Sequence, residues 1–502
     1  MDPLGALPLA AATALAGPRP RLPADRPRHP AGAVLSEPSF VFHRQLRETL
    51  PWAVRGEGSW LVDAAGRRYL DGCGGAMVAN LGHDLDDLAA AVAAEIGSLG
   101  YVNGTQFTHR AVEELAAELA AVLPRPLEVS YFLSSGSEAI EAAVKLARQL
   151  QVERGRAGKW KVISRVPSYH GNTLAALALS GREHYRRIYG PLLLDLPRIP
   201  APDPYRHPGD AGTTGSALEE EIARQGADSV AAFLYEPIGG SSSGAVVPSR
   251  EYVERIFATC RRHDVLVIAD EVLCGMGRTG RWLGCEHFLG EPQEEVPHPG
   301  GDELRPYPGG ERAESLVPDV VVLGKGLNAG ALPLSAVVAH REHLELLRLG
   351  SGAFNHAQTY SHHPAACAAG LATVRRLRRD RLVERVAERE GRFFAALAPL
   401  RDSPLVGDVR GRGFLAAIEL VADRESKDPF ARAARLAERV TAAAFAAGLL
   451  VWPNVGHVDG ERGDLLMLAP PFTASDGELD EIGTRLAPAL ATVERDLRSE
   501  RS

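Results

Sequence analysis

The chain has 502 residues, of which 45% are hydrophobic and 24% charged, and its net charge is −8. This length and composition are typical of an ordinary globular enzyme with a large core, usually built as a large domain and a smaller one. The acidic balance, without a long basic run, argues against a nucleic acid partner. No run approaches the ~18 apolar residues of a membrane-spanning helix.

Cysteine usage points to a reducing compartment. The chain has five cysteines, scattered without C-x-x-C pairing: Cys73, Cys260, Cys274, Cys285 and Cys367. This pattern favours the cytoplasm over a disulfide framework or a zinc site. The apolar opening Leu7–Ala12 follows Asp2 without a positively charged region, which argues against a secretory signal. We expect a cytoplasmic protein with no metal site and no membrane partner.

The first chemically informative element is a strand followed by a helix. Val129–Leu133 reads as a strand, and apolar residues recur at helical spacing in Glu138–Arg148. The small polar turn between them is therefore a helix N-terminus, whose free N–H groups and dipole attract anions. Gly136 lets the backbone approach a phosphate closely, and the hydroxyls of Ser135 and Ser137 can add donors. An ordinary serine N-cap would produce the same pattern.

Two later strands each end near a charged side chain. Val265–Ala269 is followed by Asp270, and Val320–Leu323 is followed by a glycine and Lys325. Unbroken apolar runs are typical of buried parallel strands, and ligands bind outside the carboxyl ends of such strands. An amine that can bond to a carbonyl and a carboxylate that can hold a protonated pyridine are the minimal equipment for pyridoxal phosphate chemistry. A lysine between two glycines is by itself more often part of a solvated turn.

Six motifs occur in order along the chain: Ser135–Ala139, Tyr169–Thr173, Glu236–Ile238, Ala269–Val272 with Gly277–Gly280 behind it, Gly324–Gly326 and Thr359–Pro364. This series resembles the class III pyridoxal-phosphate-dependent aminotransferases, which include ornithine, 4-aminobutyrate and ω-amino acid aminotransferases. The resemblance covers about residues 40–490. It implies an α/β chain of fold type I, with a mostly parallel central sheet in a large domain. A smaller α/β domain would combine the N- and C-terminal segments.

The expected domain organisation follows from this resemblance and from composition. Residues 1–36, rich in proline, alanine and arginine, should form a disordered extension. Residues 37–90 would begin the small domain, 91–374 would form the large cofactor-binding domain, and 375–502 would complete the small one. Residues 290–317 are dense in proline and glycine, which predicts a surface insertion. A strand is predicted at Leu415–Leu420.

The resemblance also assigns roles around the cofactor ring. Lys325 would attach the cofactor covalently and then move a proton between substrate Cα and cofactor C4′. Asp270 would hold the protonated ring nitrogen. Tyr169 and Val272 would pack on the two faces of the ring, although without the family pattern Tyr169 reads as a core aromatic.

Phosphate and substrate contacts are implied in the same way. Ser135, Gly136 and Ser137 would bind the cofactor phosphate from one subunit, and Thr359 of the partner subunit would bind it from the other. The family therefore implies a homodimer with shared active sites. Glu236 would face the substrate. The alternatives are a loop-capping role for Thr359 and a strand-end cap of a backbone N–H for Glu236.

Substrate recognition departs from the family pattern. Met467 and Trp452 stand where relatives commonly carry arginines that bind carboxylates. Burying an unpaired carboxylate costs several kcal/mol, so another cation must replace them. Arg462 and Arg412 are the candidates. Small residues at Gly74–Met77, where relatives often carry a tryptophan, predict a roomy pocket and a bulky or long-chain amine donor.

The predicted reaction is a ping-pong transamination from a primary amine or ω-amino acid to a 2-oxo acid, pyruvate or 2-oxoglutarate. The alternative is a class III isomerase, an aminomutase or amino-acid racemase, which would use the same site without an acceptor. A non-catalytic relative would be expected to lose Lys325 or Asp270, and both are present. A decarboxylating enzyme is disfavoured because Gly74–Met77 offers no polar side chain for a departing carboxylate.

Overall fold

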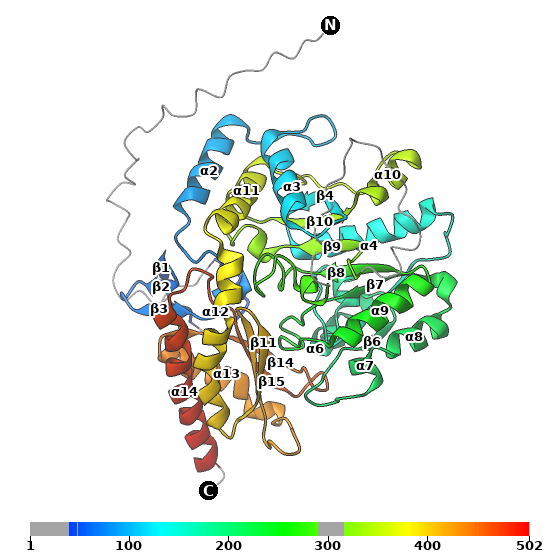
Figure 1. Cartoon of the computed structure of the whole chain (residues 1–502). Coiled ribbons are helices and arrows are strands. Elements are labelled where there is room, and N and C mark those ends of the chain that lie inside the picture. Colours follow the sequence, from blue (N-terminus) through cyan, green and yellow to red (C-terminus); the bar gives the residue numbers. More distant parts are fainter. Residues whose placement is uncertain (1–39, 48, 290–315, 501–502) are drawn as a thin grey trace. The chain divides into compact units, whose positions relative to one another are not determined.

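The computed structural model describes residues 40–47, 49–289 and 316–500 (Figure 1). The predicted extension at 1–36 lies outside these residues, as does nearly all of the predicted insertion at 290–317. The chain divides into two compact units, Met1–Arg55 with Val62–Arg67, and Gly56–Leu61 with Arg68–Ser502. The elements described below belong to the second unit, except β1 (Ala53–Glu57) and β2 (Trp60–Asp63), which cross the division.

A seven-stranded sheet with the order β4-β10-β9-β8-β7-β5-β6 forms the centre of this unit. Neighbouring strands from β9 through β6 are parallel, and β10 runs antiparallel to both β4 and β9. The predicted α/β fold with a mostly parallel sheet is therefore confirmed. The strands are β4 (Leu127–Leu133), β5 (Lys161–Val166), β6 (Arg198–Pro200), β7 (Val230–Tyr235), β8 (Leu266–Asp270), β9 (Val320–Leu323) and β10 (Ser335–His340).

Both faces of the sheet are covered. Alternate side chains of a strand point to opposite faces, and each set packs in a different apolar cluster. Val320 and Val322 of β9 pack in one apolar cluster, together with helix α4 (Gly136–Glu153). Val321 and Leu323 pack in a second cluster, which includes side chains of α9 (Arg250–Arg262). Every residue of β7 to β10 is buried. This two-sided burial explains the unbroken apolar runs of these strands.

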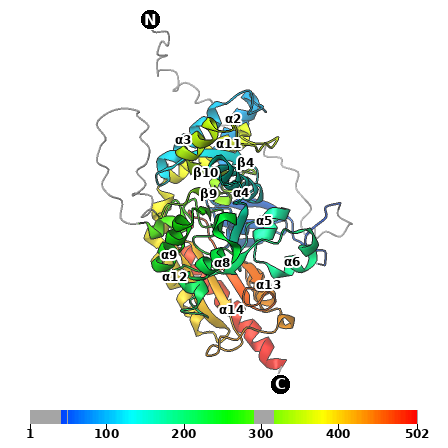
Figure 2. The same ribbon diagram turned by 90° about the vertical axis from the view of Figure 1, so that its right-hand side faces the viewer.

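Further helices lie around the strands of this unit (Figure 2). None of the helices within the described residues is long and apolar enough to cross a membrane. They are α1 (Gly74–Met77), α2 (Asp86–Ser98), α3 (Arg110–Val122), α5 (Leu174–Leu179), α6 (Glu183–Tyr189), α7 (Ala211–Thr214), α8 (Ala217–Gln225), α10 (Arg341–Leu349), α11 (Pro364–Arg379), α12 (Leu382–Leu397), α13 (Leu436–Ala446) and α14 (Asp476–Ser499).

The C-terminal part of the chain builds a second, antiparallel sheet of order β11-β12-β15-β14. Its strand β12 (Leu415–Leu420) coincides with the predicted strand. Strand β3 (Arg68–Asp71) pairs in parallel with β13 (Leu449–Leu450), so a segment before the seven-stranded sheet and a segment after it in sequence share a sheet. The predicted domain boundaries stay a prediction. The other strands are β11 (Val406–Arg412), β14 (Trp452–Val455) and β15 (Asp464–Leu468).

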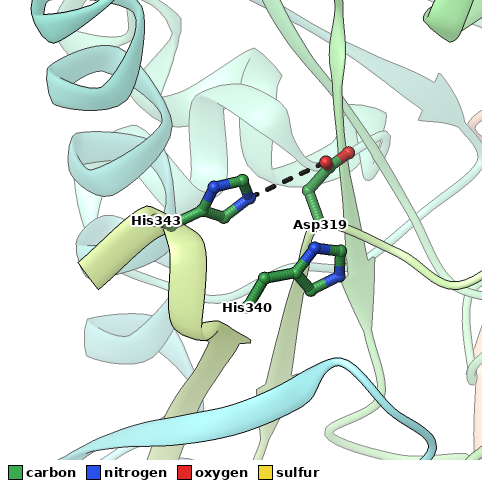
Figure 3. Close-up of side chains that lie close together, drawn as sticks. All are labelled: Asp319, His340 and His343. Atoms are coloured by element: carbon green, nitrogen blue, oxygen red, sulfur yellow. Dashed lines mark ion pairs between the residues drawn. The ribbon is translucent and has the colours of Figure 1, made fainter. Parts of the chain in front are cut away.

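A buried polar cluster lies at the end of β9 opposite Lys325 and contains Asp319, His340 and His343 (Figure 3). Asp319 Oδ2 accepts hydrogen bonds from Arg261 Nη1 at 2.6 Å and from the Val267 backbone N–H at 2.8 Å. Burial acts to raise the pKa of Asp319, but Arg261 and His343 outweigh it and hold that pKa well below its ordinary value. Because the guanidinium already matches the carboxylate charge, we interpret the cluster as an ion-pair network that joins β8, β9 and β10.

Candidate active site

One cavity brings together six of the predicted cofactor-binding residues: Gly136, Ser137, Tyr169, Asp270, Val272 and Lys325. It also includes Glu236, which was expected to face the substrate. Two predicted contacts do not line it. Ser135 lies one residue before the start of α4, and Thr359 is exposed on a turn.

The N-terminus of α4 is the predicted phosphate site. The Ser135 side chain accepts a hydrogen bond from the Glu138 backbone N–H at 3.3 Å, so Ser135 is the N-cap of the helix. The Ser137 Oγ accepts a hydrogen bond from the Asn172 backbone N–H at 2.9 Å. The first turn of this helix borders the cavity through Gly136 and Ser137. Its N–H groups and the helix dipole form a site for an anion, while a phosphate contact from Ser135 stays a prediction.

Glycines allow the loops around this site to approach closely. A Cβ on Gly136 would lie 3.1 Å from Val272 Cγ1, and a Cβ on Gly324 would lie 3.2 Å from the same atom. The Val272 side chain therefore occupies space that these two glycines leave open. It lies between the helix N-terminus and the loop that carries Lys325. A larger side chain at either position would push the phosphate site and the lysine apart.

Lys325 and Asp270 reach the cavity from neighbouring strands. Strands β8 and β9 are parallel, with Asp270 paired to Val322, so both strands end at the same edge of the sheet. Lys325 has a backbone φ of 40°, a left-handed conformation that is uncommon outside glycine and clusters at functional sites. Burial lowers the pKa of Lys325, and the Asp270 charge opposes this change. Burial thus favours the neutral, nucleophilic amine.

A histidine positions the Asp270 carboxylate. His170 Nδ1 lies 2.8 Å from Asp270 Oδ2, and the Val272 backbone N–H donates to Asp270 Oδ1 at 3.1 Å. Both side chains are almost completely buried. His170 Nε2 is buried and makes no hydrogen bond to the described residues. The contact gives His170 the role of orienting Asp270.

Glu271 points away from this pair and holds the following loop. Its carboxylate accepts hydrogen bonds from the backbone N–H groups of Gly284 and Cys285, both at 2.7 Å, and lies 3.0 Å from Cys274 Sγ. Burial raises the pKa of Glu271. Glu271 therefore supports the loop behind the site through hydrogen bonds and lies outside the cavity lining.

Glu236 follows β7 and brings a second carboxylate to the cavity. Its Oε1 accepts a hydrogen bond from the Gly240 backbone N–H at 3.1 Å. Its Oε2 is buried without a hydrogen-bond partner among the described residues. Burial raises the pKa of Glu236. The strand-end cap expected as an alternative is present, and the second oxygen remains available to a ligand.

Sequence reasoning missed Arg182. Its guanidinium carbon lies 4.4 Å from the centre of the Tyr169 ring. Its Nε donates to Ser242 Oγ at 2.8 Å, and its Nη2 donates to Ser241 Oγ at 2.7 Å. Burial lowers the pKa of Arg182. A signal was present in the sequence, since Arg182 follows the apolar stretch Leu174–Leu179 directly behind the Tyr169 motif.

The two arginines expected to bind a substrate carboxylate lie outside the cavity lining. Arg462 is exposed, and its Nε donates to Asp459 Oδ2 at 2.7 Å. Arg412 is also exposed, with its Nε 3.8 Å from Glu390 Oε1. The structure therefore does not bring either side chain together with Lys325, and their substrate roles stay a prediction.

An apolar cluster borders the cavity where relatives were expected to carry arginines. Met467 is fully buried in this cluster, and Trp452 packs against it. The cluster includes Ile238 and Cys274, which line the cavity. Gly75 is exposed, and a Cβ built there would meet no atom within 4 Å. None of the residues Gly74–Met77 lines the cavity that contains Lys325, so the roomy pocket stays a prediction.

These residues fit pyridoxal phosphate. A helix N-terminus suits its phosphate, an oriented carboxylate suits its ring nitrogen, and a buried amine suits its carbonyl carbon. At the carboxyl edge of a mostly parallel sheet, this arrangement defines a pyridoxal-phosphate-dependent enzyme of fold type I. The family model of aminotransferase class III matches residues 41–294 and 311–490. The chain belongs to the class III aminotransferase family, which uses pyridoxal phosphate.

Individual relatives agree with this assignment. The aminotransferase YodT of Bacillus subtilis is 36% identical over 472 residues, covering 92% of this chain and 100% of that protein. The β-alanine–pyruvate aminotransferase of Pseudomonas aeruginosa is 33% identical, and the match covers 90% of this chain and 94% of that protein. The ω-transaminase of Pseudomonas jessenii, solved in complex with PMP, has a TM-score of 0.77 at 31% identity. The match covers 89% of this chain and 93% of that one. These comparisons give no support to the isomerase alternative.

Proposed function

We propose that this aminotransferase transfers the amino group of a primary amine or ω-amino acid to pyruvate or 2-oxoglutarate in a ping-pong reaction. The observation that carries the proposal is the convergence of Lys325 and Asp270 in one cavity at the carboxyl edge of β8 and β9. The names of two relatives support the substrate class. They are the β-alanine–pyruvate enzyme of Pseudomonas aeruginosa and the taurine–pyruvate enzyme of Rhodobacter capsulatus.

Each residue of the cavity has a separate role in the proposed reaction. Bound pyridoxal phosphate supplies the electron-withdrawing ring on which the amino group is exchanged. The Lys325 amine holds the cofactor and afterwards moves the substrate Cα proton as a general acid and base. Asp270, oriented by His170, keeps the ring nitrogen protonated. Tyr169 and Val272 hold the ring, while Gly136 and Ser137 bind the phosphate through the start of α4.

Acceptor dependence tests this function against the isomerase alternative. A panel of primary amines and ω-amino acids is incubated with the purified holoenzyme, with pyruvate, with 2-oxoglutarate or with no acceptor. We expect an amine to be consumed only when a 2-oxo acid is present, because the second half-reaction must regenerate the cofactor. The amine and the 2-oxo acid should be consumed in equal amounts. Conversion of an amino acid to its isomer without any acceptor would favour the alternative. If β-alanine and 4-aminobutyrate prove the best donors, the roomy-pocket inference fails.

We also propose a cytoplasmic homodimer in which Thr359 of the partner subunit completes each phosphate site. Support for the shared site is that Thr359 is exposed and lies outside the cavity of its own chain. An exposed threonine on a turn is available to a neighbouring subunit. Support for the cytoplasm is that all five cysteines are free and buried.

Subunit mixing tests the shared site. Lys325→Ala and Thr359→Ala chains should each be far less active than wild type, because one loses the amine and the other a phosphate contact. Unfolding and refolding them together should restore up to about one quarter of wild-type activity, since half of the dimers would carry one intact site of two. Activity is measured with the best donor from the panel. No recovery above the separate variants, or a fully active monomer, would contradict the shared site.

A further inference from the structure

The proposed reaction requires a cation that the family pattern does not supply in its usual places. The acceptor is a 2-oxo acid, and a carboxylate buried without a partner costs several kcal/mol. Met467 is buried in an apolar cluster, and Trp452 packs against it. Arg462 and Arg412 are exposed and each lies near a carboxylate of its own. The positive charge must come from another element.

Arg182 lies beside the cavity and meets this requirement. Its guanidinium stacks on the Tyr169 ring at 4.4 Å and donates to Ser241 Oγ at 2.7 Å. Tyr169 and Ser241 both line the cavity that contains Lys325. Within the described part of the chain, no carboxylate lies within the 4.0 Å of an ion pair from Arg182. Arg182 therefore has no ion-pair partner among the described residues, and it contacts two lining residues of the cavity without lining it itself.

The serine loop that holds Arg182 is itself fixed by another arginine. Arg410 donates to the backbone carbonyls of Gly244 at 2.7 Å and Ser243 at 3.1 Å. Unlike Arg182, Arg410 is matched in charge, because its Nη1 lies 2.6 Å from Glu419 Oε2 and 3.2 Å from Asp408 Oδ2. Arg410 therefore has a structural task. It positions the loop in which the two preceding serines, Ser241 and Ser242, hold the Arg182 guanidinium. Little side-chain entropy of Arg182 is then lost when a ligand binds.

The charge of Arg182 acts on Lys325. Burial and then the Arg182 charge lower the pKa of Lys325, while Asp270 and Glu236 oppose them. Burial likewise lowers the pKa of Arg182, with Glu236 acting in the opposite direction. The cavity is therefore surrounded by charges of both signs. Only Lys325 and Arg182 provide positive charge there among these groups, and Lys325 is assigned to the cofactor.

We propose that Arg182 binds the carboxylate of the 2-oxo acid acceptor, an inference that rests on the proposed function. A guanidinium presents a planar set of five N–H donors, and the bonds of Arg182 to two serine hydroxyls and to Tyr185 leave donors for a carboxylate. Stacking on Tyr169 and the two serine bonds fix the orientation of the fork before the acceptor arrives. Arg182 thereby takes over the carboxylate contact for which the sequence suggests Arg462 or Arg412.

The test compares two acceptors that differ in the carboxylate. Pyruvate carries it, and acetaldehyde is the same carbonyl compound without it. Arg182→Gln removes the charge and should raise the KM for pyruvate at least tenfold, or ~1.4 kcal/mol per decade. The KM for acetaldehyde should stay within about twofold of wild type, because no charge-assisted contact is lost there. Arg182→Lys, which keeps the charge without the fork, should fall between the two.

Matched controls separate the possible outcomes. Arg187→Gln changes an exposed arginine of α6, the helix that begins directly after Arg182. This arginine lies 3.5 Å from Glu461, and its loss should leave both KM values unchanged. The visible absorption of the bound cofactor should be the same in Arg182→Gln and in wild type. Three results would overturn the role of Arg182 while leaving the aminotransferase function intact. They are an equal increase of both KM values, loss of the cofactor from Arg182→Gln, and a raised KM for pyruvate in Arg462→Gln instead of Arg182→Gln. If wild type uses neither pyruvate nor any other 2-oxo acid, both the proposed function and the role of Arg182 are wrong.

Discussion

Lys325→Ala should bind pyridoxal phosphate weakly and lose nearly all turnover, by roughly 10²–10⁴-fold or more, the general range for a positioned acid–base group. Two functions disappear together, because the same amine attaches the cofactor and moves the substrate proton. Initial rates with the best amine and pyruvate measure the loss. Wild-type holoenzyme treated with borohydride should carry the cofactor mass on the peptide that contains Lys325.

The small number of lysines makes this labelling test decisive. The chain has five lysines, and the other four make hydrogen bonds that occupy their amines: Lys145 with His356, Lys159 with three backbone carbonyls, Lys161 with Gln225 and Lys427 with the Tyr205 carbonyl. Lys145→Ala, an exposed change on α4, is the control and should retain wild-type rates. Cofactor found on any of these four lysines would show that the assignment of Lys325 is wrong.

Asp270→Asn should slow the half-reaction with the amine donor by at least about a hundredfold, or ~2.7 kcal/mol at 1.36 kcal/mol per decade. Asparagine keeps the shape of the side chain and can still bond to His170. It carries no negative charge, however, and cannot stabilise a protonated ring nitrogen, so the cofactor loses its capacity to withdraw electrons. Single-turnover absorbance after mixing holoenzyme with donor measures the rate. The cofactor itself should remain bound, because the phosphate site is unchanged.

A neighbouring carboxylate provides the comparison for Asp270. Glu271 is equally buried, but it bonds to the backbone of Gly284 and Cys285 and does not line the cavity. Glu271→Gln should therefore affect stability more than the rate of the half-reaction. Near-normal rates in Asp270→Asn together with a large rate loss in Glu271→Gln would mean that the wrong carboxylate had been chosen.

The sequence by itself determined the fold class and the central chemical groups, because these depend on local patterns. Continuous apolar runs end at Asp270 and near Lys325, since strands buried on both faces need apolar side chains at every position. The N-terminus of α4 was predictable in the same way, from a small polar turn followed by helical spacing. The ordered motifs then identified the family, which the comparisons confirm.

Only the tertiary structure decided which charged side chains share the cavity. His170 meets Asp270 across 100 residues of sequence, and Arg182 meets Ser241 across 59. Such contacts depend on how loops between packed strands return to one edge of the sheet, and no local periodicity encodes that path. For the same reason Arg462, plausible from its position in the chain, turned out to face solvent beside Asp459. Backbone pattern specifies strands and helix ends locally, whereas charge pairing is a property of three-dimensional proximity.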